Sequence, residues 1–259
     1  MIKKVNVLRV EKSDVTKTAD EIAVEKNLRI YINNKFITSL KISPGYEKEF
    51  GIGFCAGEGL IDINSITTVD VDVDSVNIHT DDEDFELKVE LYLSSDCMSG
   101  LRPKMTYDDV FVSSDLRVNA GKIFQGIIEL QKKAVMWQRT GGTHISGLMY
   151  GNKFDKLIAV EDISRHTSTD KILGIGIIKG LNFRECIFLT SGRLPGDLVI
   201  KIARVGIPVA VSRTSVLDSG IKVAENTGVT LIGFARGKRM NIYTHPEKIT
   251  IDKDINNIQ

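Results

Sequence analysis

Residues 140–171 read TGGTHISGLMYGNKFDKLIAVEDISRHTSTDK, and this stretch decides the fold class. Two apolar runs, 144–150 and 157–160, predict strands joined by a loop that opens with Gly-Asn-Lys. A cluster of acidic and basic side chains follows the second run. Thr167 and Asp170 then have the spacing of a capping box at the start of a helix. A strand end, polar side chains and a helix N-terminus therefore meet here, so we look for the functional site at this point.

The rest of the C-terminal part alternates between apolar strands and helices. Strands and helices are expected at 186–190, 198–204, 207–211, 219–226, 230–235 and 240–244. Before the opening stretch, Ser114 and Asp115 are expected to cap one long helix that reaches about Arg139. The pattern predicts an α/β fold in which residues 108–259 form a three-layer α/β/α sandwich with a partly parallel sheet.

Residues 1–107 predict a smaller α+β domain. A hairpin is expected over 28–43, with its turn at Asn33-Asn34. Ser43 and Pro44 are expected to begin a helix over 46–60. That helix carries four glycines, which weaken a helix by propensity and so indicate that another backbone packs closely against it.

Alternating apolar residues predict three further strands in this domain, at 67–73, 76–79 and 85–93, in an antiparallel sheet with one wet face. Residues 94–107, SSDCMSGLRPKMTY, interrupt the pattern with small polar residues and a proline. We interpret them as a loop between two domains, 1–107 and 108–259, with Cys97 inside the loop.

Charge is balanced overall but not locally. The chain has 34 Lys plus Arg against 34 Asp plus Glu, so no overall field favours a nucleic acid as partner. Residues 61–90 hold ten acidic residues against the single Lys88, whereas residues 236–239 hold three cations. An anion-binding site is therefore expected on the C-terminal part, and the acidic surface is expected to face a basic partner.

Composition and cysteine usage restrict the class of protein. Hydrophobic residues at 42% and charged residues at 26% are typical of a soluble globular protein. No secretory signal or membrane-spanning run is evident, so no membrane partner is expected. Three cysteines without metal-type spacing predict a reducing compartment, the cytoplasm, and no metal site.

Four polar loops are expected at strand or helix ends, where open α/β sheets bind ligands. Their arginines, histidines and glycines suit a phosphorylated ligand of about dinucleotide size. The candidate binding residues in these loops are Thr140, Gly141, Gly142, His144, Glu161, Asp162, Arg165, His166, Ser191, Gly192, Arg193, Phe234, Ala235, Arg236, Gly237, Lys238 and Arg239.

The histidines and cysteines each leave two interpretations open. His144 and His166 have the chemistry of general acid/base groups, but each could equally hold a loop by bonding a carboxylate. Cys97 has small polar neighbours and therefore access for reaction, whereas Cys55 and Cys186 lie in apolar runs and are assigned to the core.

Several motifs in order resemble one known family, the FdhD-type formate dehydrogenase accessory sulfurtransferases. These are SPGYEKEFGIGFCAGEGLI, the Ser-Ser-x-Cys loop, TGGTHISG, EDISRHTSTDK, SGR and TLIGFARGKRMNIYTHPEKI. The resemblance covers nearly the whole chain. It implies a cytidine-deaminase-like C-terminal domain, although the deaminase zinc signature is missing.

The resemblance also implies a function. Such a protein accepts sulfur from a cysteine desulfurase as a persulfide and passes it to a bis-molybdopterin guanine dinucleotide cofactor for formate dehydrogenase. Cys97 matches the persulfide position, which makes it the expected catalytic residue. Residues 234–239 match the hairpin that contacts the cofactor, and GDP is expected to mimic the cofactor.

Departures from the family pattern leave parts of this picture open. Many relatives carry Cys-x-x-Cys in the loop, but here Met98, Ser99 and Gly100 follow Cys97. Relatives read Ser-Ala-Pro-Thr where this chain has residues 212–215, Ser-Arg-Thr-Ser. A single cysteine still suffices in principle, because a persulfide is attacked at its outer sulfur.

Two other functions are compatible with these residues. One is a cofactor-binding chaperone that delivers without chemistry, and the other is a nucleotide hydrolase that uses His144 or His166. The sequence leaves open the client enzyme, molybdenum against tungsten, and the oligomeric state, a homodimer included.

Overall fold

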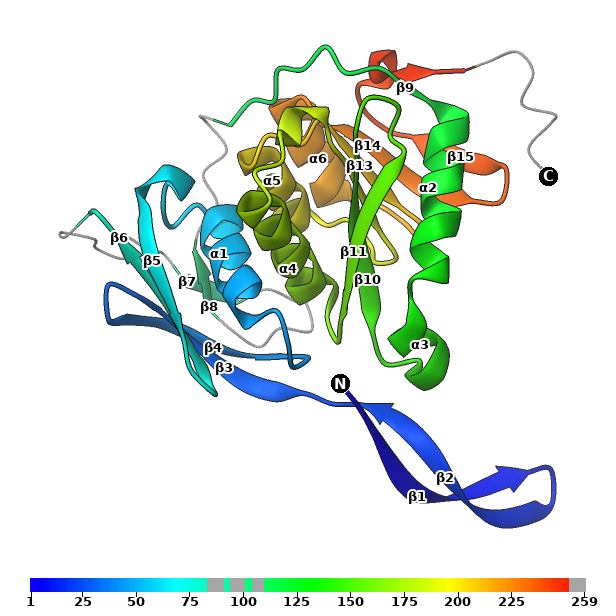
Figure 1. Cartoon of the computed structure of the whole chain (residues 1–259). Helices are drawn as coiled ribbons and strands as arrows, with labels where there is room; N and C mark the ends of the chain where they lie inside the picture. Colours follow the sequence, from blue (N-terminus) through cyan, green and yellow to red (C-terminus); the bar gives the residue numbers. More distant parts are fainter. Residues whose placement is uncertain (83–90, 94–100, 104–109, 252–259) are drawn as a thin grey trace.

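The structure, a computed structural model, describes residues 1–82, 91–93, 101–103 and 110–251. A six-stranded sheet in the order β11-β10-β12-β13-β14-β15 lies in the C-terminal part (Figure 1). Its strands are β10 (His144–Tyr150), β11 (Lys156–Asp162), β12 (Ile187–Thr190), β13 (Val209–Ser212), β14 (Thr230–Arg236) and β15 (Arg239–Ile242). The pairs β12–β13 and β13–β14 are parallel and the other pairs antiparallel. The prediction of a mixed α/β fold with a partly parallel sheet is therefore confirmed.

Helices cover both faces of this sheet (Figure 1). The helices α4 (Arg165–Ile178), α5 (Gly196–Arg204) and α6 (Asp218–Thr227) lie on one face, and α2 (Ala120–Lys132) lies on the other. Successive side chains of a strand point to opposite faces. Accordingly, Phe188 packs in the core under α4, α5 and α6, and its neighbour Leu189 packs in the core under α2.

A second, four-stranded sheet forms the N-terminal part in the order β4-β3-β6-β5. Its elements are β3 (Lys26–Ile32), β4 (Lys35–Ile42), β5 (Ile66–Val71) and β6 (Ser75–Thr80), with α1 (Glu47–Glu58) packed against one face. Asn33 and Asn34, at φ 47° and 64°, form the predicted hairpin turn. The predicted antiparallel pairing of the strands at 67–73 and 76–79 is found in β5 and β6, but the sheet as a whole is mixed, because β3 pairs with β6 in parallel across the connection that contains α1.

The two parts meet where α1 crosses α4, and glycines make this crossing possible. A Cβ atom on Gly53 would lie 1.8 Å from the backbone oxygen of Asp170, and one on Gly174 would lie 1.8 Å from that of Glu49. The predicted close approach of another backbone to the glycine-rich helix is therefore found, and α4 provides that backbone.

Buried charges also join the two parts. The Lys201 ammonium lies 2.7 Å from a carboxylate oxygen of Asp170 and 2.8 Å from one of Glu58, and all three side chains are buried. The ammonium of Lys171 lies 2.6 Å from a carboxylate oxygen of Asp162 and donates to the Ser43 carbonyl at 2.7 Å. The contacts of Lys201 tie α1 to α4 and α5, and those of Lys171 tie the segment before α1 to α4 and β11. We call these five charged side chains the interlobe ion cluster.

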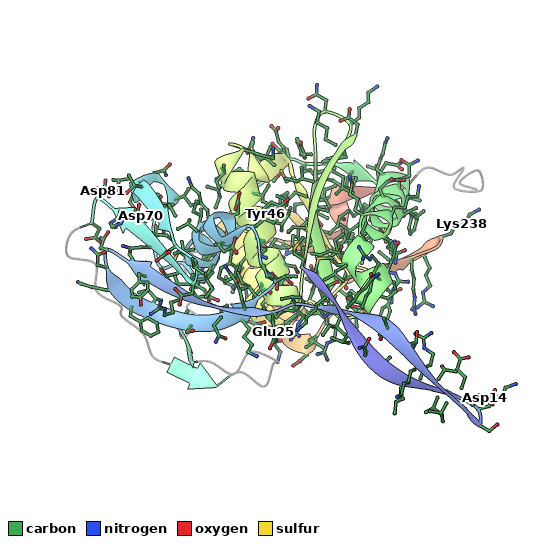
Figure 2. The ribbon with its side chains drawn as sticks, turned by 60° about the horizontal axis from the view of Figure 1, so that its bottom comes forward. Asp14, Glu25, Tyr46, Asp70, Asp81 and Lys238 are labelled. Atoms are coloured by element: carbon green, nitrogen blue, oxygen red, sulfur yellow. The ribbon has the colours of Figure 1, made fainter. Side chains whose placement is uncertain are left out.

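A long hairpin, β1 (Ile2–Glu11) and β2 (Asp14–Ala23), projects from the body of the molecule, with Asp14 at its tip (Figures 1 and 2). Leu8 and Val10 on it are each 65% exposed. The base of the hairpin is held by Arg139 of α3 (Val135–Thr140), which donates to both carboxylate oxygens of Glu21 at 2.7 Å. The sequence pattern gave no indication of this hairpin.

The remaining elements are short. They are the antiparallel pair β7 (Leu91–Leu93) and β8 (Leu101–Pro103), the parallel pair β9 (Val118–Asn119) and β16 (Ile249–Thr250), and the 3-10 turns η1 (Ile63–Ser65), η2 (Phe183–Glu185) and η3 (Pro246–Lys248).

Most of the predicted strand 85–93 and most of the predicted linker 94–107 lie outside the described residues, as does Cys97. In the part of the chain that the structure describes, no helix combines the length and apolar character needed to cross a bilayer.

The predicted starts of helices α1 and α4 are wrong. Helix α1 begins at Glu47 rather than at Pro44, and the backbone N–H of Ser43 donates to Asp162 instead. Helix α4 is capped by Ser164, which accepts from the N–H of His166, while Thr167 donates to Asp162 at 2.6 Å. Its Thr167–Asp170 spacing is therefore not a capping box.

The helix predicted from Ser114 to Arg139 is two helices, α2 and α3. Helix α2 is capped by Asn119, whose side chain accepts from the N–H of Gly121. Lys133 and Ala134 separate α2 from α3. The apolar period continued across this break, which is why the sequence pattern did not reveal it.

Candidate functional site

The four loops singled out by sequence come together at one edge of the six-stranded sheet. The parallel strands β12, β13 and β14 end at this edge, and the antiparallel β10 begins there, since Ser146 pairs with Thr190. Antiparallel pairing of His144 with Asp162 brings the end of β11 to the same edge. The topology thus gathers the polar loops as the rule for open α/β sheets predicts.

A pocket of about 450 Å³ lies at this edge, between α2, α3 and the loops after β12 and β13. Its lining residues are Gln131, Ala134, Trp137, Gly141, Gly142, Thr143, His144, Ile145, Ile163, Ser191, Arg213 and Thr214. None of these is acidic. Five candidate residues from the sequence, Gly141, Gly142, His144, Ser191 and the neighbouring Thr140 at the end of α3, therefore lie in or beside one pocket.

His144 is half-buried in this pocket and its Nδ1 lies 3.3 Å from Oγ of Ser191. Burial lowers the pKa of His144 below its ordinary value of 6.5, and the positive charges of Arg165 and Arg193 lower it further. The imidazole is consequently neutral at physiological pH and offers one donor and one acceptor rather than a charge.

The loop after β12 is fixed in place by its neighbours. A Cβ atom on Gly192 would lie 2.7 Å from Cβ of Arg165, so glycine lets this loop approach the start of α4. Ser212 at the end of β13 donates to the Gly192 carbonyl at 2.6 Å. Arg193, the next residue, is exposed.

The two predicted carboxylates make structural contacts. Glu161 accepts from the backbone N–H groups of Met136 and Trp137 at 2.7 Å each and from the Thr143 hydroxyl at 2.9 Å, so it holds the start of α3. Asp162 is fully buried in the interlobe ion cluster. Contact of either carboxylate with a ligand stays a prediction. Glu161 positions the start of α3, and Asp162 joins the end of β11 to α4.

Arg165 and His166 are buried at the start of α4. Nδ1 of His166 lies 3.9 Å from a carboxylate oxygen of Asp197, the first acidic residue of α5. This arrangement favours the structural interpretation of His166 over general acid/base catalysis, since the ring has no exposed surface.

The hairpin between β14 and β15 carries the remaining candidates. Arg236 and Arg239 pair across its turn, and each guanidinium lies over the ring of Phe234, at 5.7 and 5.8 Å from the ring centre. Gly237 turns the chain at φ 60°. Ala235 is buried and anchors the strand, whereas Lys238 stands at the tip, away from the acidic Asp70 and Asp81 of the N-terminal part (Figure 2).

Two of the three cysteines can be placed. Cys55 is buried in α1 and burial raises the pKa of its thiol well above the ordinary value. Cys186 is buried just before β12 and burial raises the pKa of its thiol to about 12. Both assignments to the core are confirmed, and neither thiol has access to a partner protein.

The lining residues that sequence reasoning missed include Gln131, Trp137 and Arg213. Arg213 follows directly after an apolar strand, as Ser191 does, so its position at the carboxyl edge was a usable signal. Gln131 and Trp137 carried no such signal, because the break between α2 and α3 was not foreseen. Among the described residues, no group of His, Cys, Asp and Glu side chains is arranged to hold a metal ion.

The fold and the site define a mixed α/β protein with a basic, non-acidic pocket at the carboxyl edge of its sheet. The FdhD/NarQ family model matches residues 23–250. The sulfur carrier protein FdhD of Methanothermobacter thermautotrophicus is 36% identical over 250 residues, which cover 96% of this chain and 99% of that protein. Protein FdhD of Methanocaldococcus jannaschii is 33% identical over 244 residues, covering 94% and 97%.

A solved structure gives the same result. The crystal structure described as a formate dehydrogenase accessory protein from Desulfotalea psychrophila matches with a TM-score of 0.80 and 27% identity, covering 96% of this chain and 99% of that one. This chain belongs to the FdhD/NarQ family. The family resemblance recognised from the sequence motifs is confirmed.

Proposed function

We propose that this protein is a sulfur carrier that receives sulfur from a cysteine desulfurase as a persulfide on Cys97. It then passes the sulfur to the bis-molybdopterin guanine dinucleotide cofactor that formate dehydrogenase requires. Membership of the FdhD/NarQ family carries the proposal, since the relative from Methanothermobacter thermautotrophicus is named a sulfur carrier protein.

The placement of the cysteines supports Cys97 as the carrier. The chain has three cysteines, and a carrier thiol must be accessible and ionisable. Cys55 and Cys186 are buried with raised pKa values and meet neither condition. Cys97, outside the described residues, is the candidate that remains.

The transfer step needs no second thiol. The Cys97 thiolate attacks the outer sulfur of the desulfurase persulfide, a new S–S bond forms, and the desulfurase cysteine leaves as a thiolate. The step involves no net oxidation or reduction. In the second step an electron pair of the acceptor attacks the outer sulfur of the Cys97 persulfide, the acceptor–sulfur bond forms, the S–S bond breaks, and Cys97 leaves as the thiolate.

The carboxyl edge of the sheet supports cofactor binding. A pocket of about 450 Å³ falls in the size range of small-molecule sites, and it lacks acidic lining residues. Arg193, Arg236, Lys238 and Arg239 are exposed near this edge, and within the described residues none of them forms an ion pair with a carboxylate. Uncompensated cations beside such a pocket suit the phosphates of a guanine dinucleotide.

Three finer predictions belong to the same proposal. They are a cytidine-deaminase-like C-terminal domain, a boundary between residues 107 and 108, and a cytoplasmic location. The three layers around the six-stranded sheet support the first. A reducing compartment agrees with a carrier thiol that must not be lost to disulfide formation.

The experiment is sulfur loading followed by intact mass. The protein is incubated with a cysteine desulfurase and L-cysteine, and we expect the parent and Cys186→Ala to gain one sulfur atom. Cys97→Ala should gain none. Equal loading of Cys97→Ala and the parent would reject the carrier role of Cys97. If Cys97→Ala also still activates formate dehydrogenase, the function is that of a cofactor-binding chaperone.

A further inference from the structure

Arg213 occupies a position in the pocket that the preceding proposal does not use. It follows β13, lines the same cavity as His144 and Ser191, and is half-buried. Its backbone N–H donates to the Thr190 carbonyl at 2.9 Å, which joins the Arg213 loop to the end of the neighbouring strand. The backbone from which the Arg213 side chain extends is therefore fixed by the sheet.

The Gln131 side chain fixes the guanidinium end of the Arg213 side chain. With the amide oriented to satisfy the hydrogen bonds, its oxygen accepts from Nε and Nη2 of Arg213, the latter at 3.1 Å. Gln131 lies in the last turn of α2, across the pocket from the β13 loop. The guanidinium is thus held between two layers of the molecule.

The partner that holds Arg213 is neutral. In the described part of the chain no carboxylate forms an ion pair with Arg213, and the pocket lining contains no acidic residue. A guanidinium has five N–H donors, of which Gln131 takes two. Three donors and the full positive charge consequently remain for a ligand.

We propose that Arg213, oriented by Gln131, binds a phosphate group of the nucleotide part of the ligand that occupies this pocket. A planar, pre-oriented guanidinium matches phosphate oxygens in pairs, and the neutral amide orients it without cancelling its charge. The neutral His144 and the Ser191 hydroxyl on the same lining can add hydrogen bonds to the same group. This inference rests on the proposed binding of a guanine nucleotide and deepens it by naming the phosphate-binding residue.

The test uses two variants that remove the free charge in different ways. Arg213→Gln removes the guanidinium, and Gln131→Glu leaves it in place but gives it a carboxylate partner. The matched control is Arg184→Gln, with the same change of charge at an exposed site in η2, before β12 and so at the opposite end of the sheet. Calorimetric titrations with GDP, pyrophosphate and guanosine measure binding, and thermal unfolding checks each fold.

We expect Arg213→Gln and Gln131→Glu each to weaken binding of GDP and of pyrophosphate about tenfold or more, as expected from loss of a charge-assisted hydrogen bond. Guanosine binding and the Arg184→Gln control should match the parent. Unchanged GDP binding in folded Arg213→Gln overturns the inference. An equal loss of guanosine binding also overturns it, because Arg213 would then contact the base.

The outcome is separable from that of the sulfur-carrier proposal. If the parent binds neither GDP nor pyrophosphate, the role of Arg213 is rejected, while sulfur loading of Cys97 is still decided by intact mass. If Cys97 takes no sulfur, the calorimetric loss in Arg213→Gln still establishes the phosphate contact.

Discussion

Two groups of charged side chains in this molecule are arranged in opposite ways. In the interlobe ion cluster, Lys171 and Lys201 are buried and each ammonium lies within 2.8 Å of a carboxylate oxygen. At the carboxyl edge of the six-stranded sheet, Arg213 is held by a neutral amide and Arg236 and Arg239 by an aromatic ring. Cations are paired with carboxylates in one region and kept from them in the other.

The two arrangements suit two different roles, one in stability and one in ligand binding. A buried charge is tolerated only when an opposite charge or several hydrogen bonds compensate for its lost hydration, so the interlobe cluster fixes how the two parts fit together. A cation whose protein partners are neutral still has its charge available for an anionic ligand. The predictions below test whether the first region governs stability and the second governs binding.

The largest effect is expected at Lys201. Lys201→Met leaves the carboxylates of Asp170 and Glu58 buried without their shared ammonium, which should cost about 3–5 kcal/mol of unfolding free energy. Urea denaturation measures it. The control is Lys222→Met, whose ammonium lies 3.7 Å from Asp218 on the surface and should change stability by less than about 1 kcal/mol. Similar values for both variants would contradict the structural role of the cluster.

The next effect concerns the crossing of α1 and α4. In Gly53→Ala the new Cβ would lie 1.8 Å from a backbone oxygen, which cannot move without shifting α4, so a loss of about 1–3 kcal/mol or more is expected. Gly57→Ala in the same helix is the milder comparison, because the atoms nearest its Cβ are those of the Lys201 side chain at 3.2 Å, a contact that a shift of a few tenths of an ångström relieves. A Gly53→Ala protein as stable as Gly57→Ala would show that the two helices lie farther apart.

The arginines of the β14–β15 hairpin should behave in the opposite way. Both are exposed, so Arg236→Gln with Arg239→Gln should change the unfolding free energy by no more than about 1 kcal/mol, the scale of exposed cation–π contacts. GDP affinity should fall about tenfold or more. Calorimetry and urea denaturation on the same samples provide both numbers. A stable protein with unchanged GDP affinity would remove this hairpin from the binding site.

The smallest effect is the titration of His144. Its pKa should lie below 6.5 because of burial and the charges of Arg165 and Arg193, and Arg193→Gln should raise it. Between the lowered folded pKa and 6.5 the unfolded chain binds more protons. The contribution to stability is therefore complete above 6.5 and is lost as the pH falls through the folded pKa. NMR titration of the imidazole measures the His144 pKa in the parent and in Arg193→Gln. A parent pKa above 6.5 would contradict the electropositive pocket.

Much of the C-terminal part could be predicted because its signals are local. Continuous apolar strands alternate with helices, and the loops after β12, β13 and β14 must meet at one edge in a parallel arrangement. That rule is enough to predict from the sequence that the loops carrying His144, Ser191 and Arg236 lie at the same edge.

Predictions failed where a tertiary contact competes with a local signal. Ser43 and Thr167 have helix-capping chemistry, but one gives its backbone N–H and the other its hydroxyl to Asp162. Glu161 and Asp162 also contact α3 and the interlobe ion cluster, roles that the sequence did not indicate, while their contact with a ligand stays a prediction. A polar residue near a strand end has several potential partners, and the sequence does not rank them.

The amino-acid sequence by itself determined the family, the mixed α/β class and the group of loops that meet at one edge of the sheet, because each depends on motifs or periodicities within short segments. Only the tertiary structure decided which charges are paired. It placed Lys201 between Asp170 and Glu58 and gave Arg213 a neutral partner in Gln131. The physical reason is that a charge is compensated by groups within a few ångströms in space, and here those groups lie tens of residues away along the chain.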